Sequence, residues 1–591
     1  MVTCRTGAVL HCPVRCLAVL QMPSRRHGTL YNAMGSSHKT GNAGKMDKAD
    51  AMADVVTEFD YIIVGAGSAG SALAARLSED QNMRVLVLEA GPRGKHPWLH
   101  IPIGYGKVFY DRRFNWKYNT EPQTNLNNRS IYWPRGKVLG GSSAINAMVY
   151  VRGHPGDFAE WEDVAPGWGW DDVEPMFRRM ENWQGAPDQK RGRNGPLGIT
   201  DVTSMVHPLS HAYLEAAEQA GIATNPDYNS GDMDGAGLFQ ITTKNGLRAS
   251  AAQAYLKPAA KRPNLKIVAR AHATRVLLEG PIATGIEYLL DGRRMTAKAR
   301  REVILCGGAI NTPQLLQLSG IGPAALLQKH GIPVVKDAPH VGRNLADHLG
   351  FELVYASKVP TLNQVLRPWW GKVKVGLEFM LRRTGPLTMS LNQGGGFVWL
   401  GDADGPPDLQ LYFMPMSYTR APAGVRPLMN PDPFPAYKIG FNPCKPRSRG
   451  YLEIQSPDPM QAPRMEANYL SDERDWQEMI AGTRLVRDIA RMPALADISD
   501  GEIAPAPDME SDEDIMDVIR EHSWTVFHQC CTCRMGRDAS SAVVDEKLTV
   551  HGIDRLRIAD ASIFPTIPTG NTNASAIMVG EKAASIIRGE T

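Results

Sequence analysis

Three glycines and one acid are spaced as in a site that binds a dinucleotide. The glycines are Gly65, Gly67 and Gly70, which follow the apolar run FDYIIV at 59–64. In such sites the first glycine allows a tight turn, the second lets the backbone approach a pyrophosphate, and the third lets a helix pack on a strand. Glu89 follows after about 20 residues, where a carboxylate can accept hydrogen bonds from ribose hydroxyls and repel a 2′-phosphate. The pattern favours FAD or NAD over NADP.

A second reactive group lies in the run HQCCTCRMG at 528–536. The imidazole of His528 has a near-neutral pKa, so it is able to take the proton of an alcohol. Cys530 and Cys533 form a C-x-x-C pair, a spacing that zinc sites and redox-active dithiols share. A zinc site needs four ligands, and the chain holds no second pair. We therefore expect no metal, and packing cysteines are favoured over a redox pair.

The elements that must position these residues begin as strand, glycine turn, helix and strand. Residues 59–64 predict a buried strand, 71–79 (SALAARLSE) a helix, and 84–88 (RVLVL) a second strand that ends at Glu89. Three later runs, at 351–355, 409–414 and 437–441, predict strands of another sheet, and 472–491 predicts an amphipathic helix.

Composition excludes several classes of protein. Of 591 residues, 43% are hydrophobic and 21% charged, which is typical of a globular chain and not of a disordered or coiled-coil one. The formal net charge is +3, and the body has no basic face for nucleic acid. Eight irregularly spaced cysteines favour a reducing compartment. No run approaches the ~18 apolar residues of a spanning helix, so we expect a protein without a transmembrane segment, for which peripheral membrane contact stays open.

Residues 1–57 are expected to be an N-terminal tail outside the fold. From Met1 to Lys45 the chain has no acid but several Arg and Lys, as transit peptides do. The sequence from Met52 resembles the start of a domain. We therefore favour a tail that is artefactual or inert, and dispensable, over a targeting peptide or a functional arm. The expected location is cytoplasmic or peripheral to the inner membrane, and mitochondrial if the tail is a genuine transit peptide.

Four further blocks resemble the signatures of the glucose-methanol-choline (GMC) oxidoreductase family. The first is PRGKVLGGSSAINAMVYVRG at 134–153, and the second is GAINTPQLLQLSGIG at 308–322, with VGRNLADH at 341–348 behind it. The run at 528–536 and LRIADASIFPTIPTGNTNASAIMVGEKAA at 556–584 complete the set. Two phrases, WKYNTEPQ at 116–123 and RPNLKIVARAHATRVLLEG at 262–280, look most like the choline-dehydrogenase-like, acceptor-linked alcohol dehydrogenases.

The resemblance implies an α/β, Rossmann-like FAD domain interleaved with an α+β substrate domain built on an antiparallel sheet. The FAD-binding domain would comprise 58–158, 241–348 and 525–591, and the substrate-binding domain 159–240 and 349–524. Some members carry a histidine that bonds covalently to the flavin. Ile145 stands at that position here, so we expect FAD to be bound without a covalent link.

The resemblance also implies which residues contact FAD. The glycine motif and Glu89 would hold the ADP half, the loop at 140–149 would run beside the flavin and its ribityl chain, and the backbone of Val276 would touch adenine. The residues at 560–561 and 572–573 would meet the flavin. The full set is Gly65, Gly67, Ser68, Ala69, Gly70, Glu89, Ala90, Val138, Gly140, Gly141, Asn146, Ala147, Met148, Val149, Val276, Asp560, Ala561, Thr572 and Asn573.

In the family's pattern His528 is the catalytic base and Asn571 the second active-site residue. We expect oxidation of a primary alcohol to the aldehyde, with hydride passing to flavin N5 and electrons to a quinone or other carrier. An O₂-dependent oxidase and a hydroxynitrile-lyase-like, non-redox enzyme are the alternatives on the same fold. The chain departs from the family after His528, where members have a proline next and a glycine at the position of Cys531.

The substrate cannot be identified from sequence. A quaternary ammonium substrate such as choline would need an aromatic cage and a carboxylate. Candidate aromatic residues are more often part of a core, so choline is a minority expectation; these candidates are Trp369, Trp370, Tyr412, Phe413 and Tyr418.

Overall fold

A computed structural model describes residues 57–401, 405–418 and 430–590. The predicted tail therefore lies, apart from its last residue, outside the described residues. Within these ranges no helix has both the length and the hydropathy needed to cross a bilayer.

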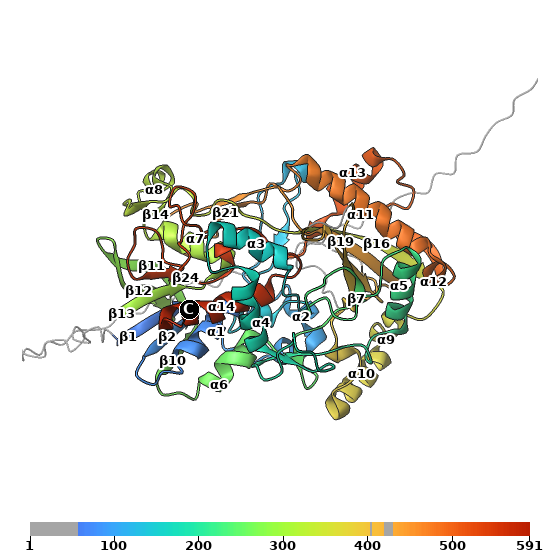
Figure 1. Ribbon diagram of the computed structural model, residues 1–591, viewed down its shortest axis with the longest axis horizontal. Coiled ribbons are helices and arrows are strands. Elements are labelled where there is room, and N and C mark those ends of the chain that lie inside the picture. Colours follow the sequence, from blue (N-terminus) through green and yellow to red (C-terminus); the bar gives the residue numbers. More distant parts are fainter. Residues whose placement is uncertain (1–56, 402–404, 419–429, 591) are drawn as a thin grey trace, which may run out of the picture. The chain divides into compact units, whose positions relative to one another are not determined.

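The first sheet is built around the predicted nucleotide-binding unit. β1 (Thr57–Val64) leads through the glycine turn to α1 (Ser68–Leu77), and β2 (Val85–Glu89) lies parallel to β1. Every residue of β2 is buried, as expected for a parallel strand covered on both faces. The sheet order is β10-β2-β1-β13-β12-β11, with β24 paired to β13 (Figure 1). The added strands are β10 (Leu265–Ala269), β11 (Ala271–Glu279), β12 (Ile282–Leu290), β13 (Arg293–Leu305) and β24 (Leu556–Ile558).

The second large sheet is antiparallel, as predicted, and its order is β22-β16-β19-β18-β17-β7. Its central strands β18 and β19 are buried throughout; helices pack on the sheet, and residues of both strands also line the cavity described below. The strands are β7 (Gly235–Leu238), β16 (Leu349–Ser357), β17 (Gly394–Val398), β18 (Leu409–Met414), β19 (Ala436–Pro443) and β22 (Ser499–Ala504). β23 (Trp524–Thr525) also pairs with β16. The boundaries of the two predicted domains stay a prediction, because contacts join the described residues into one unit.

Helices cover both sheets. α14 (Asn573–Arg588) packs on α1, where Gly580 lies so close to α1 that a Cβ would come within 2.3 Å of the Ala69 carbonyl oxygen. α11 (Glu473–Arg491) matches the predicted amphipathic helix and packs on β19 beside α5 (Pro208–Gln219) and α12 (Pro493–Ala496) (Figure 1). Further α-helices are α2 (Tyr105–Val108), α3 (Pro155–Val164), α4 (Trp170–Met180), α7 (Gly308–Leu318), α8 (Ala324–Lys329) and α13 (Asp512–His522).

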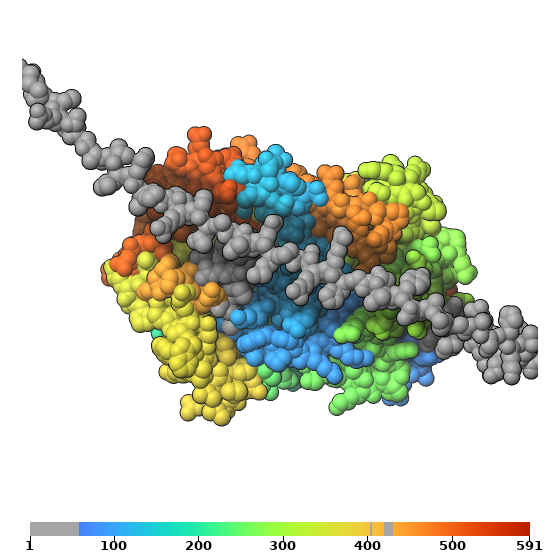
Figure 2. Space-filling model, turned by 180° about the vertical axis from the view of Figure 1, so that it is seen from behind, coloured from blue at the N-terminus to red at the C-terminus, as the bar shows by residue number. Residues whose placement is uncertain are grey.

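Two helices lie at the edge of the second sheet. α9 (Leu362–Leu366) and α10 (Trp369–Arg382) pack on each other, and α10 buries Val375 and Phe379. The yellow part of the chain that contains them projects at the lower edge in Figure 2.

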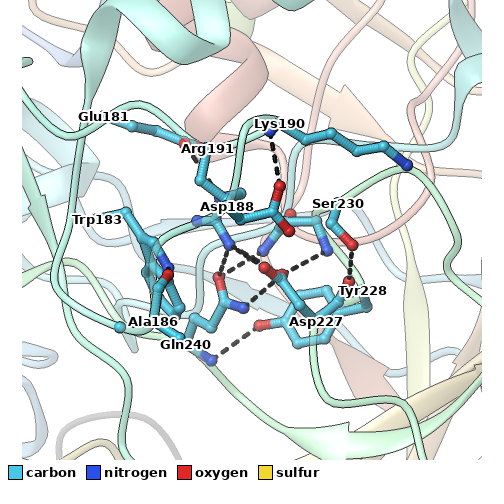
Figure 3. Close-up of polar contacts among 12 residues, drawn as sticks. Glu181, Trp183, Ala186, Asp188, Lys190, Arg191, Asp227, Tyr228, Ser230 and Gln240 are labelled. Carbon is cyan, nitrogen blue, oxygen red and sulfur yellow. Dashed lines mark hydrogen bonds and ion pairs between the residues drawn. The ribbon is translucent and has the colours of Figure 1, made fainter.

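A buried ionic cluster fixes the segment that follows the second glycine loop. Glu181 accepts bonds from Arg152 at 2.7 Å and from Arg191 at 3.1 Å. Arg191 also donates to Asp227 at 2.8 Å (Figure 3). Gln240 donates to the same Asp227 carboxylate, and its backbone carbonyl accepts from the Tyr150 N–H at 2.9 Å. Removing one charge of such a cluster leaves another uncompensated, at a cost of roughly 3–5 kcal/mol. The cluster therefore fixes the position of the chain beside residues 148 and 149.

Candidate active site

A cavity of about 570 Å³ extends between the glycine turn and the antiparallel sheet, a volume in the range of ligand and cofactor sites. One end is lined by Gly65, Glu89 and residues 271–273. The other end is lined by His528 and Asn571. The predicted cofactor residues and the predicted catalytic pair thus face one space.

The glycine turn leaves no room for a side chain at its first position. Gly65 has φ +104°, and a Cβ there would lie 2.2 Å from the carbonyl oxygen of Cys306. Glycine alone adopts this conformation without strain. The turn directs the N-terminus of α1 into the cavity, where unpaired N–H groups suit a phosphate.

Glu89 closes the same end of the cavity. Its carboxylate accepts from the backbone N–H of Ala66 at 3.1 Å and of Gly91 at 2.8 Å. Burial raises the pKa of Glu89 to about 7, although these bonds and the positive charge of Lys137 oppose the rise. The acid is thus held by the backbone at the end of β2, where the spacing predicted a ribose partner.

The second glycine loop meets the first. A Cβ on Gly141, whose φ is +53°, would lie 2.7 Å from the Cα of Gly67, so the two loops approach backbone to backbone. Further along, the Asn146 side-chain oxygen accepts from the Met148 N–H at 3.1 Å and from Arg248 at 2.8 Å. These bonds stabilise the positive φ of Met148, which is +68°.

Most predicted cofactor residues line the cavity, and four do not. Those outside its wall are Gly70, Val138, Gly140 and Val276. The N–H of Val276 donates to the Ser319 hydroxyl at 2.9 Å, and residues 271–273 of the same strand line the cavity in its place. Those in the wall are Gly65, Gly67, Ser68, Ala69, Glu89, Ala90, Gly141, Asn146, Ala147, Met148, Val149, Asp560, Ala561, Thr572 and Asn573.

The C-terminal block is bonded to both glycine-rich segments. Asp560 accepts from the Gly308 N–H at 2.8 Å and from the Thr312 hydroxyl at 2.6 Å, which fixes its turn against α7. Asn573 accepts from the Ser68 hydroxyl at 2.8 Å, at the first residue of α1. Segments about 500 residues apart in sequence therefore form one wall.

A chain of hydrogen bonds fixes the tautomer of His528. The carbonyl oxygen of Cys444 can only accept, so His348 donates its Nε2–H to it at 2.8 Å. Burial lowers the pKa of His348 to about 4, so this ring is neutral and its Nδ1 accepts the Nδ1–H of His528 at 2.9 Å. The Nε2 of His528 then carries a lone pair. It points at the Asn571 amide nitrogen, 3.1 Å away.

The backbone of His528 is held by a buried acid. Asp347 accepts from the His528 N–H at 2.8 Å, from the Thr525 hydroxyl at 2.6 Å and from the Gln529 amide at 2.8 Å. The Tyr469 hydroxyl also donates to it. Register explains the contact: Leu349 of β16 pairs with Thr525 of β23, so residues just before β16 face those just after β23.

Asn571 is positioned from two sides. Gln410 of β18 donates to its side-chain oxygen at 3.1 Å, and this orients the amide nitrogen toward His528. The loop before it is fixed by Asp157, which accepts from the N–H of Thr569 at 2.7 Å and from its hydroxyl at 3.0 Å.

The chain departs from the family's pattern at Cys531, and the structure shows the backbone conformation there. Cys531 has φ +71°, the left-handed region that a glycine adopts without cost, so the cysteine takes the conformation that its position requires. Cys530, Cys531 and Cys533 are buried free thiols, and the first two sulfurs lie 3.3 Å apart. Among the described residues, no cluster of three or more His, Cys, Asp or Glu is arranged to hold a metal ion.

Aromatic side chains that the sequence did not single out line the catalytic end. Phe109 packs edge-on against Phe527 with 5.2 Å between ring centroids, and Tyr110 stacks on Tyr132 at 5.3 Å. Of the proposed aromatic cage, Tyr412 and Tyr418 line the cavity, whereas the two tryptophans Trp369 and Trp370 are exposed and Phe413 is in the core.

One acid, Glu352, also lines the catalytic end, and Lys438 pairs with it at 2.6 Å. Glu352 and Lys438 lie in β16 and β19, and the alternating apolar pattern of these strands does not indicate a functional site. His348 and Asp347 end the quoted run 341–348, but nothing in that run indicates their partners 180 residues away.

Comparisons with known proteins agree with this geometry. A family model described as GMC oxidoreductase matches residues 59–350, and a second one of that description matches 446–580. The chain is 42% identical to an alcohol dehydrogenase [acceptor] of Pseudomonas putida, over 90% of this chain and 95% of that one. It is also 42% identical to an oxygen-dependent choline dehydrogenase of Pseudomonas syringae, over 90% of this chain and 94% of the relative.

A solved structure agrees as well. A formate oxidase from Aspergillus oryzae, studied for the modification of its FAD, superimposes with a TM-score of 0.84 at 29% identity, over 91% of this chain and 99% of that one. The two family models together cover most of the chain, and the relatives are matched over nearly their whole length. The chain belongs to the GMC oxidoreductase family.

Proposed function

We propose that the protein is an FAD-dependent dehydrogenase that oxidises an uncharged, apolar primary alcohol to the aldehyde and passes the electrons to a quinone or another carrier. FAD-dependent alcohol oxidation follows from the family and from the named relatives. The observation that carries the mechanism is the bond chain from Cys444 through His348 to His528.

The cavity suits FAD in shape and chemistry. Gly65, Gly67 and Gly141 would let the backbone lie against the pyrophosphate, and Glu89 would take the adenosine ribose. Asn146, Thr572 and Asn573 line the part that leads to His528. When bound, FAD supplies a hydride acceptor.

His528 acts as the base because its Nε2 is unprotonated and faces the cavity. Its Nδ1–H is bonded to a neutral ring that is itself bonded to a carbonyl, so the lone pair cannot move to Nδ1 without breaking both bonds. The substrate hydroxyl donates its proton to Nε2. The backbone N–H of His528 donates to Asp347, which fixes the main chain that carries the ring.

Asn571 holds the substrate oxygen. Its amide nitrogen donates a hydrogen to the Nε2 lone pair of His528. The alcohol oxygen would accept an amide hydrogen in place of Nε2, which frees that lone pair to accept the proton of the alcohol. A donor at this point stabilises the negative charge that develops on oxygen as the proton leaves. Gln410 fixes the amide, so the donor does not need to rotate.

The wall of the catalytic end favours an uncharged substrate. Phe109, Tyr132 and Phe527 offer apolar ring surface, and Lys438 already neutralises the Glu352 carboxylate. Arg135, which also lines the cavity, adds positive charge near His528 and helps to lower the pKa of that histidine. A quaternary ammonium group would therefore be desolvated without an unpaired carboxylate to stabilise it.

An alcohol screen tests the proposal. Under anaerobic conditions, benzyl-type alcohols should bleach the flavin with a kcat/KM at least tenfold above that for choline. The charged choline loses its hydration at a site without net negative charge, whereas an uncharged alcohol does not pay that cost. Lys438→Met should narrow that ratio, with flavin content as the control for folding. Preference of the wild type for choline would contradict the substrate class, and substrate turnover without bleaching would indicate lyase chemistry. Repeating the assay in air and with a quinone analogue tests the acceptor.

FAD should be released by acid. Ile145 lines the cavity at the position of the family's covalent histidine, and an aliphatic side chain cannot bond to the flavin. Acid precipitation should leave all yellow colour in the supernatant, and the denatured chain should have its unmodified mass. Colour that stays with the pellet would show an attachment at another residue.

His528→Ala should slow anaerobic flavin reduction by about 10²–10⁴-fold, the usual contribution of a general base, and leave flavin content unchanged. Asn571→Ala should cost less, because the base remains and only the oxygen contact is lost. Stopped-flow absorbance measures both rates. Part of the histidine deficit should disappear at high pH, where the alcohol ionises more readily. Near-normal reduction in the histidine variant would place the base elsewhere.

Activity should persist at unusually low pH. Burial, the neighbouring His348 and the charge of Arg135 hold the pKa of His528 well below 6.5. The ring is active when unprotonated, so kcat/KM should stay level as pH falls through 6.5 and decline only when pH reaches the depressed pKa. A pH profile with a stability control at each point measures this. A decline centred at 6.5 or above would contradict the buried, neutral ring.

A further inference from the structure

The outer face of α10 is apolar. Six large hydrophobic side chains of this helix are exposed, with Leu381 at 81% and Trp369 at 77% exposure. Such a patch on one helix is unusual for a face that meets water, where polar residues are expected. The six are Trp369, Trp370, Val373, Leu377, Met380 and Leu381.

Helical geometry gathers these side chains into one stripe. At about 100° per residue they fall in a sector of about 120°. The buried side, formed by Gly371, Val375 and Phe379, lies opposite. α10 therefore has two apolar faces, of which one packs on the protein and the other has no partner among the described residues.

Basic side chains flank the exposed stripe. Lys372 lies beside one edge of it and Lys374 beside the other, and Arg382 and Arg383 are exposed at the C-terminal end of the helix. The one acid of the helix, Glu378, bonds to the Thr384 hydroxyl at 3.1 Å. An apolar stripe with cationic borders matches a bilayer surface, where the stripe meets acyl chains and the cations meet anionic headgroups.

We propose that α10 is a membrane-docking helix that lies in the plane of a bilayer containing anionic lipid. Its 14 residues span about 21 Å, too short for a hydrocarbon core of about 30 Å. Tryptophan prefers the interface between headgroups and acyl chains, and lysine stems reach back to the headgroups. A second copy of the chain fits less well, because a two-fold contact between these stripes would bring like charges together.

Docking through α10 would bring the cavity close to the lipid. Val375 and Phe379 pack in a cluster with Tyr105, Met414 and Tyr418, and these three also line the cavity. One apolar layer thus separates the docking face from the cavity wall. Figure 2 shows the segment projecting from the body, so the helix can meet a flat surface. The membrane contact itself does not depend on the proposed reaction, although a lipid-soluble electron acceptor would be reached from this position.

Vesicle co-sedimentation tests the proposal on the full-length flavoprotein. The probes are vesicles of phosphatidylcholine alone and vesicles with roughly one third phosphatidylglycerol, a lipid whose charge attracts basic segments. The docking variant carries Trp369→Ser, Trp370→Ser and Leu381→Ser, and a charge variant carries Lys372→Gln, Lys374→Gln and Arg382→Gln. A matched control carries Val334→Ser, Val335→Ser and Met460→Ser, which replaces exposed hydrophobic side chains elsewhere.

Wild type and the matched control should sediment with anionic vesicles and bind neutral ones more weakly. The docking variant should bind at least tenfold less, and the charge variant should lose about fivefold per basic residue on anionic vesicles. Flavin content and oxidation of alcohol with a soluble dye should equal wild type in the docking variant, which separates loss of docking from loss of fold or activity.

Two results would overturn the proposal. One is wild type that stays in the supernatant with both vesicles, or a docking variant that binds as wild type does. The other is a wild-type dimer, detected by light scattering, that the docking variant converts to monomer without any vesicle binding, because a second copy would then cover the stripe.

Discussion

The buried carboxylate of Asp347 is the constraint on which the catalytic end depends. It accepts four donors, three of them from the turn at 525–529, and only 7% of the residue is exposed. Burial raises the pKa of Asp347, and these donors oppose that rise. The carboxylate ties the end of β23 to the start of β16, so the antiparallel sheet and the segment that carries His528 move as one body.

The same junction determines the chemistry. His348 follows Asp347 directly and meets His528 at 2.9 Å, so one dipeptide orients both the backbone and the ring of the base. Cys444 and Lys445, which follow the end of β19, also make two contacts that matter here. The Cys444 carbonyl accepts from His348, and Lys445 donates to Asp157, which fixes the loop before Asn571. Two dipeptides far apart in sequence therefore set the distance between base and amide.

Local patterns were sufficient to predict the elements but not their partners. The run 59–64, its glycines and Glu89 predicted β1, α1 and β2 to within three residues at each end, because burial on both faces and a tight turn leave a strong local signature. The strands at 409–414 and 437–441 were also identified. The bond between His348 and His528 could not be predicted, because it depends on the register of β16 with β23. Val276 was expected at adenine only from the family resemblance, and its contact with adenine stays a prediction; residues 271–273 of its strand line the cavity.

The chain completes its active site with its last segment. His528, Asn571, β24 and α14 all lie beyond residue 524, while α1, on which α14 packs, is among the first elements to leave the ribosome. Domains generally form as the chain is synthesised. The glycine turn and α1 are therefore made before α14, which contacts them and follows some 500 residues later. Until then the apolar side of α1 needs cover, and a premature stop before residue 528 yields a product without the proposed base. A stop between residues 528 and 571 would keep that base but remove Asn571 and α14.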